Sequence, residues 1–172
     1  MGTALSVFIF GLSYGLILFL LATGLSLTLG LMRILNLTHG ALYMFGGFVG
    51  VAVAGYANSY WAGLVAGAIC TGLIGLFLEA GFLRRLYKDE ASQVLLTIGF
   101  TYILVNIAQW LWGTFPLSGI VPGIFSWSVR VSEVTIPAFR FFIIGAGLLM
   151  AALLWLFQAK TKIGAIVRAG MD

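Results

Sequence analysis

The distribution of charge along this chain constrains its fold more than any other feature. Its 172 residues include nine Lys or Arg and five Asp or Glu, and nearly all of these lie in short clusters between long apolar runs. A soluble core cannot be built from 62% apolar and 8% charged residues, because too little polar surface would remain to face water. The mean hydropathy of +1.12 agrees. We therefore expect an integral membrane protein of the all-α class, a polytopic bundle of transmembrane helices.

The apolar runs are long enough to cross a bilayer, which takes about 20 helical residues. A polar stretch that contains all three prolines separates the last two runs. By length, the chain is predicted to form one transmembrane domain over residues 1–172. We expect five spans, at about 4–32, 40–57, 61–82, 93–113 and 138–158.

Charged and aromatic residues predict how these spans are oriented. Five spans place Arg33, the basic cluster at 84–88 and the tail at 160–168 on one side. Basic loops are retained on the cytoplasmic side, so the N-terminus is expected outside. Aromatic residues at 56–61 and 110–115 then fall at the outer interface, where such rings are enriched.

Several classes of function are excluded by what the sequence lacks. It has no GxxxxGK[ST] phosphate loop, no GxSxG and no HExxH motif, so we expect no catalysis and no ATP hydrolysis by this chain. A single histidine without neighbouring thiols or carboxylates makes a metal site improbable, and no cofactor is expected. The +4 net charge is attributed to cytoplasmic loops rather than to nucleic-acid binding. Cys70 is the only cysteine and cannot form a disulfide within the chain.

The segment 36–40 gathers the polar residues that most need an explanation. Asn36, Thr38 and His39 lie within four residues, and Gly40 follows. At membrane depth these groups require partners or a water-filled cavity. Asn36 or Thr38 could cap a new helix, and a broken or re-entrant helix here would direct backbone N–H groups at a translocation path. An interfacial turn with an ordinary cap is an equally good interpretation of the spacing alone.

The fourth run contains two polar pairs that a helix would place on its faces. Thr97 and Thr101 are four residues apart, and Asn106 and Gln109 are three apart, so the members of each pair share a face. Threonine hydroxyls can simply bond back to their own helix. The two amides predict either a bond to another helix or a polar lining. With segment 36–40, these four residues form the predicted substrate pathway.

Two further features of the third run have structural interpretations. Small residues recur every four positions, at Gly63, Gly67, Thr71 and Gly75, as on a face where another helix backbone approaches closely. Because glycine is common in membrane helices, the pattern can also arise without a packing role. Glu79 is predicted to form an ion pair with one of the two arginines at 84 and 85.

Three stretches of the chain together resemble a known family. They are Gly15 … Ala22-Thr-Gly24-Leu25-Ser-Leu … Gly30 … Asn36-Leu-Thr-His39-Gly40 … Tyr43-Met44, then Leu-Thr97-Ile98-Gly99, and finally Thr161-Lys-Ile-Gly164-Ala-Ile-Val-Arg168-Ala169 … Asp172. Their order and spacing resemble those of permease subunits from branched-chain amino acid ABC importers. The chain departs from the family at Thr38, where alanine is typical, and in its length, since family members continue with further spans. The resemblance therefore implies the N-terminal part of a permease, incomplete at its C-terminus.

The resemblance also implies partners, substrates and a location. A working importer would combine a second permease subunit, two cytoplasmic ATP-binding subunits and an external solute-binding protein in a bacterial cytoplasmic (inner) membrane. The substrate would be a branched-chain or other hydrophobic amino acid. The segment at 126–136 partly alternates polar and apolar residues, like a short exposed strand. Its Arg130 and Glu133 are candidates to contact the solute-binding protein, and a solvated connection with no partner is at least as good an interpretation. The residues implied in coupling to the ATPase are Gly164, Arg168, Ala169 and Asp172. Without the resemblance, basic residues beside an apolar stripe in this tail would equally suit a membrane-surface anchor.

Three alternatives stay open at this point. Related permeases carry urea or short amides. A helix bundle whose polar residues only hold helices together would be an assembly subunit without transport activity. A passive channel or secondary carrier would also need internal polar groups.

Overall fold

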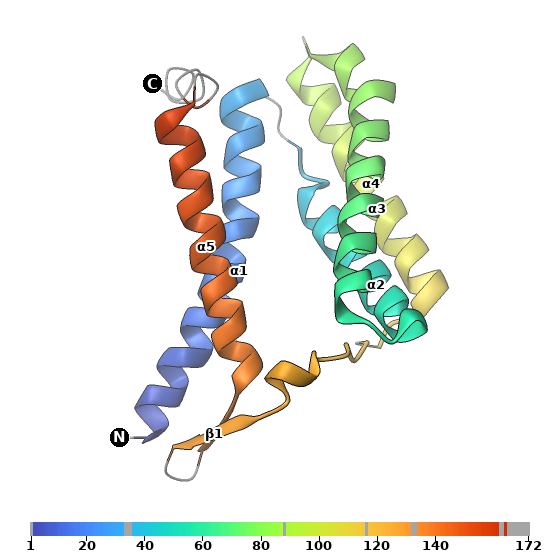
Figure 1. The fold of residues 1–172 in the computed structure, drawn as a ribbon. Helices are drawn as coiled ribbons and strands as arrows, with labels where there is room; N and C mark the ends of the chain where they lie inside the picture. Colours follow the sequence, from blue (N-terminus) through green and yellow to red (C-terminus); the bar gives the residue numbers. More distant parts are fainter. Residues whose placement is uncertain are drawn as a thin grey trace. The chain divides into compact units, whose positions relative to one another are not determined.

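The computed structural model describes residues 2–32, 36–87, 89–115, 117–131, 134–161 and 164. Five of its helices are long and apolar enough to cross a membrane, which confirms the predicted all-α polytopic fold. The long helices are α1 (Gly2–Met32), α2 (His39–Ala57), α3 (Tyr60–Gly81), α4 (Glu90–Trp112) and α5 (Ala138–Lys160) (Figure 1). The shorter elements are η1 (Leu83–Leu86), η2 (Gly123–Phe125), β1 (Ser128–Val131) and β2 (Val134–Pro137).

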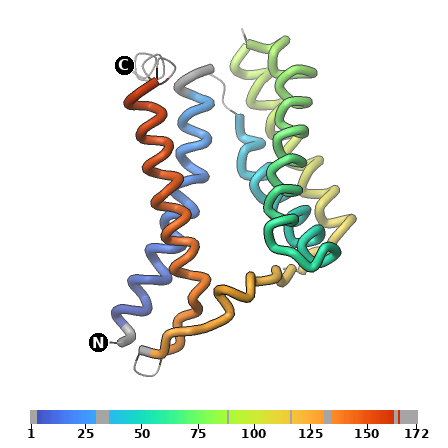
Figure 2. Tube along the Cα trace, viewed as in Figure 1, coloured from blue at the N-terminus to red at the C-terminus, as the bar shows by residue number. Residues whose placement is uncertain are grey.

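The chain divides into two compact units, which we describe separately. The first, the terminal unit, contains Met1–Leu31 and Val121–Asp172; the second, the central unit, contains Met32–Ile120. In the backbone trace of Figure 2, the central unit runs from the cyan α2 through the green α3 to the yellow α4.

Glycines set the distance between α2 and α3 in the central unit. A Cβ atom on Gly67 would lie 2.6 Å from the carbonyl oxygen of Gly46, and one on Gly50 would lie 3.2 Å from that of Gly63. The turn between the two helices is compact: Asn58 adopts a left-handed conformation with φ of 48°, one that asparagine tolerates better than most residues. The backbones of α2 and α3 can pack this closely only because the glycines at their crossing carry no side chain.

Aromatic and aliphatic side chains hold α4 against the other two helices. Phe45 of α2 packs with Leu104 and Ala108 of α4, and its ring lies edge-on to Trp112 with centroids 5.6 Å apart. At the opposite end of α4, a second cluster consists of Leu78 and Leu83 packed against Leu96 and Phe100. The two clusters fix α4 at both ends.

In the terminal unit, a β-hairpin leads into α5. The strands β1 and β2 are antiparallel, with Val131 opposite Val134 and Ser128 opposite Pro137. The backbone N–H of Ala138 donates to the carbonyl of Trp127 over 3.0 Å, which closes the hairpin where α5 begins. The alternation at 126–136 thus predicted extended structure correctly, although the segment forms two strands.

Candidate functional site

The break between α1 and α2 is built from local hydrogen bonds. Helix α1 ends at Met32 and α2 begins at His39. The Asn36 side-chain oxygen accepts from the N–H of Thr38 over 3.1 Å, and the Asn36 carbonyl accepts from the N–H of His39 over 3.3 Å. Thr38 occupies the N-cap position of α2, but its side chain forms no capping bond. Asparagine therefore shapes the turn, and the threonine hydroxyl is directed elsewhere.

The Thr38 hydroxyl ties the start of α2 to α4. It donates to the carbonyl oxygen of Thr97 over 3.0 Å, and both threonines are fully buried, at 0% exposure. The Thr101 hydroxyl donates to the same carbonyl over 2.8 Å and lies 3.4 Å from the carbonyl oxygen of Leu37. Three of the residues predicted for the pathway, at 38, 97 and 101, are thus brought together.

These contacts place the start of α2 well inside the helical layer of the central unit. Thr97 lies seven residues after Glu90, the first residue of α4, which corresponds to about 10 Å along a helix. Figure 1 accordingly shows α2 beginning partway along α3 and α4 rather than level with their ends. This geometry favours a broken helix over an interfacial turn. A helix that starts at this depth presents the positive end of its dipole inside the layer.

The first turn of α2 has an open side. His39 is half-buried and Gly40 is exposed. A Cβ atom placed on Gly40 would have no neighbour within 4 Å. Thr38 is therefore engaged in packing, whereas Gly40 leaves space beside the first turn of α2.

The two predicted amides lie on another face of α4. Leu104 and Ala108 are buried, whereas Asn106 and Gln109 are exposed. The Asn106 amide nitrogen donates to the carbonyl of Tyr102, one turn back in its own helix, over 2.7 Å. Asn106 and Gln109 are therefore not brought together with the threonines.

Of the four small residues predicted to form a packing face on α3, three lie against α2 and one does not. Gly63 and Gly67 lie against α2, and the methyl group of Thr71 would be 2.5 Å from a Cβ atom on Gly46. Gly75 has no neighbour within 4 Å of its Cβ position. The close approach of α2 thus involves the first three of the four predicted positions.

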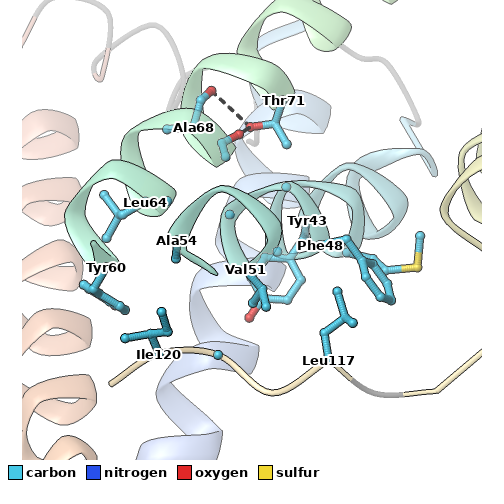
Figure 3. Close-up of a pocket in the computed structure, with 17 residues that line it drawn as sticks. Tyr43, Phe48, Val51, Ala54, Tyr60, Leu64, Ala68, Thr71, Leu117 and Ile120 are labelled. Atoms are coloured by element: carbon cyan, nitrogen blue, oxygen red, sulfur yellow. Dashed lines mark hydrogen bonds between the residues drawn. The ribbon is translucent and has the colours of Figure 1, made fainter. Parts of the chain in front are cut away.

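An apolar groove lies beside this crossing, with a volume of about 660 Å³. Residues Leu117 to Ile120 run along it, and Gly119 comes within 3.5 Å of Val51 at its Cβ position. Figure 3 shows Val51, Leu117 and Ile120 around this space together with side chains of α3. Its lining includes the hydroxyl-bearing residues Tyr43, Tyr60 and Thr71, and no charged residue among those described. We call this the α2–α3 groove.

Sequence reasoning missed the α2–α3 groove, although a signal for it exists. Gly46, Gly47 and Gly50 give α2 a nearly side-chain-free surface. Such a surface can accommodate either another helix or a ligand, and the structure shows Gly46 and Gly50 against α3 while Gly47 has no neighbour within 4 Å of its Cβ position.

At the charged end of α3, one prediction was wrong. Among the described residues, Glu79 forms no ion pair with Arg84 or Arg85; its carboxylate accepts a hydrogen bond from the hydroxyl of Tyr87. This hydrogen bond, with smaller contributions from burial and the Glu79 charge, raises the pKa of Tyr87 to about 12. The 3₁₀ turn η1 brings the tyrosine back over α3, whereas the sequence spacing suggested only the arginines.

The predicted coupling segment is described only at its beginning. The N–H of Gly164 donates to the Thr161 hydroxyl over 3.0 Å, and a Cβ atom on Gly164 would collide with the backbone of Gln158. A side chain at this position would therefore displace the turn after α5. Arg168, Ala169 and Asp172 lie outside the described residues, as does Glu133 of the outer segment.

A comparison with protein families complements this geometry. The family model described as "branched-chain amino acid transport system / permease component" matches residues 7–172. Neither the comparison with curated proteins nor that with solved structures returned a match.

Proposed function

Because this chain belongs to the branched-chain amino acid transport permease family, we propose that it is the membrane-spanning component of an ATP-driven importer for branched-chain or other hydrophobic amino acids. It is a multi-pass membrane protein of a transport subunit family. In the proposed importer, ATP is hydrolysed by separate cytoplasmic subunits. A second permease subunit and an external solute-binding protein complete the assembly in a bacterial inner membrane.

The observation that carries this proposal is the broken start of α2. Thr38 donates to the Thr97 carbonyl, so a polar turn is held about 10 Å along α4. An uninterrupted transmembrane helix would have no such turn at this depth. Irregular backbone at membrane depth is tolerated where it is buried in protein or lines a water-filled cavity. His39 and Gly40, on the open side of this turn, are the residues that we assign to the path.

The α2–α3 groove supports an apolar substrate. Its lining is mostly aliphatic or aromatic, with a few hydroxyl groups, and the described lining residues carry no charge. Small-molecule sites commonly combine an apolar lining with a few polar groups that fix orientation. We assign the side chain of the amino acid to this groove. Gly47→Leu would fill the groove, and Gly72→Leu is the matched control because Gly72 also has no neighbour within 4 Å but does not line the groove.

The amide face of α4 favours urea or a short amide as a second candidate substrate. Asn106 and Gln109 carry carboxamides on one exposed face, and carboxamides both donate to and accept from amides. A path along this face would select for hydrogen bonding rather than for an apolar side chain.

Uptake of radiolabelled leucine and urea by cells or proteoliposomes, with and without the ATPase subunits, tests these assignments. Leucine uptake that requires ATPase supports the importer, and it should fall in Gly47→Leu but not in Gly72→Leu. ATPase-dependent uptake of urea alone would establish the second candidate. Uptake without the ATPase would indicate a passive channel or carrier, and no uptake of either solute by the assembled complex would indicate an assembly subunit.

A further inference from the structure

A positive charge lies within the fifth span of this protein, outside all the sites considered above. Arg140 is the third residue of α5. Its Nη1 atom donates to the Ser13 hydroxyl oxygen over 3.2 Å, and its guanidinium carbon lies 5.0 Å from the centroid of the Phe10 ring. An arginine over an aromatic face gains cation–π attraction. One turn of α1 therefore supplies both contacts.

The Ser13 hydroxyl is held in an orientation that lets its oxygen accept a hydrogen bond from an arginine. It is fully buried, at 0% exposure, and its hydroxyl donates to the Phe10 carbonyl over 2.9 Å. With its only proton used inside α1, the oxygen can act solely as an acceptor toward Arg140. The arginine is thus oriented by a rigid acceptor rather than by a flexible side chain.

The charge of Arg140 has no counter-ion in the described part of the terminal unit. Residues 2–31, 121–131, 134–161 and 164 include no Asp or Glu. The first turn of α5 contains no acidic residue, and the helix dipole places additional positive potential there. Only one of the five guanidinium donors is used in a hydrogen bond with described residues. This locus therefore favours an anion with several oxygens.

Helix lengths place this locus at the outer boundary of the membrane. Arg140 and Lys160 lie twenty residues apart in α5, about 30 Å along the helix and close to the thickness of the hydrocarbon layer. Ser13 and Arg33 are also twenty residues apart in the sequence. Lys160 and Arg33 belong to the side predicted to be cytoplasmic, so Arg140 faces the opposite surface.

We propose that Arg140, oriented by Ser13 and Phe10, is a binding site for an oxyanion at the outer membrane boundary. The planar guanidinium matches phosphate and carboxylate geometry, and it can offer two parallel N–H donors. Two sources share this chemistry: the phosphate of an outer-leaflet phospholipid and the carboxylate of an arriving solute. The carboxylate source rests on the proposed importer function, whereas the phosphate source is independent of it.

Thermal melting of the purified chain in a neutral detergent, with defined probes, tests this proposal. The lipid pair is dioleoylphosphatidylglycerol and dioleoylglycerol, which lacks the phosphate; the solute pair is leucine and leucinamide, which lacks the carboxylate. The variants are Arg140→Gln and Ser13→Ala, with Arg130→Gln as the control because Arg130 is an exposed arginine of the same unit. Loss of a charge-assisted bond weakens binding by about tenfold or more, so Arg140→Gln should lose the stabilisation at probe concentrations that stabilise wild type.

Each outcome has a defined meaning. Stabilisation by phosphatidylglycerol alone that Arg140→Gln loses identifies a lipid phosphate site; stabilisation by leucine alone that it loses identifies a carboxylate site. Ser13→Ala should weaken the same response partially. Because this variant keeps the Arg140 charge, it provides the test if Arg140→Gln does not fold. If neither probe stabilises wild type, or if Arg140→Gln responds like Arg130→Gln, the oxyanion site does not exist. Because uptake is not measured, failure here leaves the proposed function unaffected.

Discussion

Thr38 shows how one hydroxyl group can position a helix. Its side chain crosses from the start of α2 to the Thr97 carbonyl, 59 positions later in the chain. The residue is fully buried, so the bond is shielded from water that could replace it. An alanine at this position would lack this bond, so the threonine adds a specific link between α2 and α4.

Replacing Thr38 by valine should therefore weaken the central unit while keeping its shape. We expect a loss of about 0.5–1.5 kcal/mol of stability, the usual net contribution of one hydrogen bond. Thr38→Ser retains the hydroxyl and is the control. Thermal melting in detergent measures both variants; equal melting of Thr38→Val and wild type would show that the bond contributes nothing.

Asp89, at the start of α4, predicts that the stability of the central unit depends on pH. Its carboxylate accepts from the N–H of Ser92 over 3.2 Å and caps α4, and hydrogen bonds from the Ser92 hydroxyl and N–H lower the pKa of Asp89. A carboxyl group with a lower pKa when folded stabilises the protein above its unfolded pKa of about 3.9. That contribution is lost as pH falls through the lower, folded value.

The variant Asp89→Ala should accordingly melt below wild type at pH 7, and the difference should shrink as the pH drops below about 4. Ser92→Ala removes one of the two bonds from Ser92 and should show a smaller difference of the same sign. Melting curves across this pH range provide the measurement. A difference between Asp89→Ala and wild type that is independent of pH would contradict the capping role.

At the scale of elements, the α2–α3 pair is sensitive to added volume. Gly67→Ala would bring a Cβ atom to 2.6 Å from the Gly46 carbonyl oxygen. Backbone atoms must then move, which typically costs about 1–3 kcal/mol. Gly75→Ala adds the same methyl group on the same helix where no atom lies within 4 Å, and it should be neutral or stabilising.

Folded yield and melting temperature of these two variants distinguish two explanations for the glycines of α3: a helix-packing face, or the general abundance of glycine in membrane helices. Destabilisation by Gly67→Ala alone supports the close crossing of α2 and α3. Equal behaviour of the two variants would mean that α2 and α3 are separated more widely than the structure shows.

Helices were easier to predict than contacts, and particular residues show why. Apolar length and flanking polar residues place the ends of α2 and α4 within three residues, because lipid requires continuous backbone hydrogen bonding. The bond between Arg140 and Ser13 joins positions 127 apart, and no local pattern encodes it. Arg140 could have been noticed as a charge within an apolar run, but its partners could not. Likewise, Glu79 accepts a hydrogen bond from Tyr87 rather than pairing with an arginine. The turn η1 brings Tyr87 back to Glu79, and the sequence did not indicate this turn.

At the scale of the whole molecule, three features support the assignment of this protein as a permease. The family match covers residues 7–172, five helices have the length and hydropathy of spans, and α2 begins inside the helical layer of its unit. The first two place the protein in a membrane transport system. The third is the central claim, because the proposed path begins where this polar turn leaves open space at Gly40.

Water accessibility of Gly40 tests this claim most directly. In a Cys70→Ser background, cysteine is introduced in place of Gly40, which has open space around it, or in place of Leu95, which is 73% exposed on α4. Leu95 is only five residues from the start of α4, about 7 Å, and therefore nearer that end of the helical layer than the start of α2. Both variants are then treated in membranes with a water-soluble maleimide. Thiols react as thiolates, which require hydration. We predict that the cysteine in Gly40→Cys reacts much faster than that in Leu95→Cys, although it lies deeper; equal or slower reaction would contradict a water-accessible path at the start of α2.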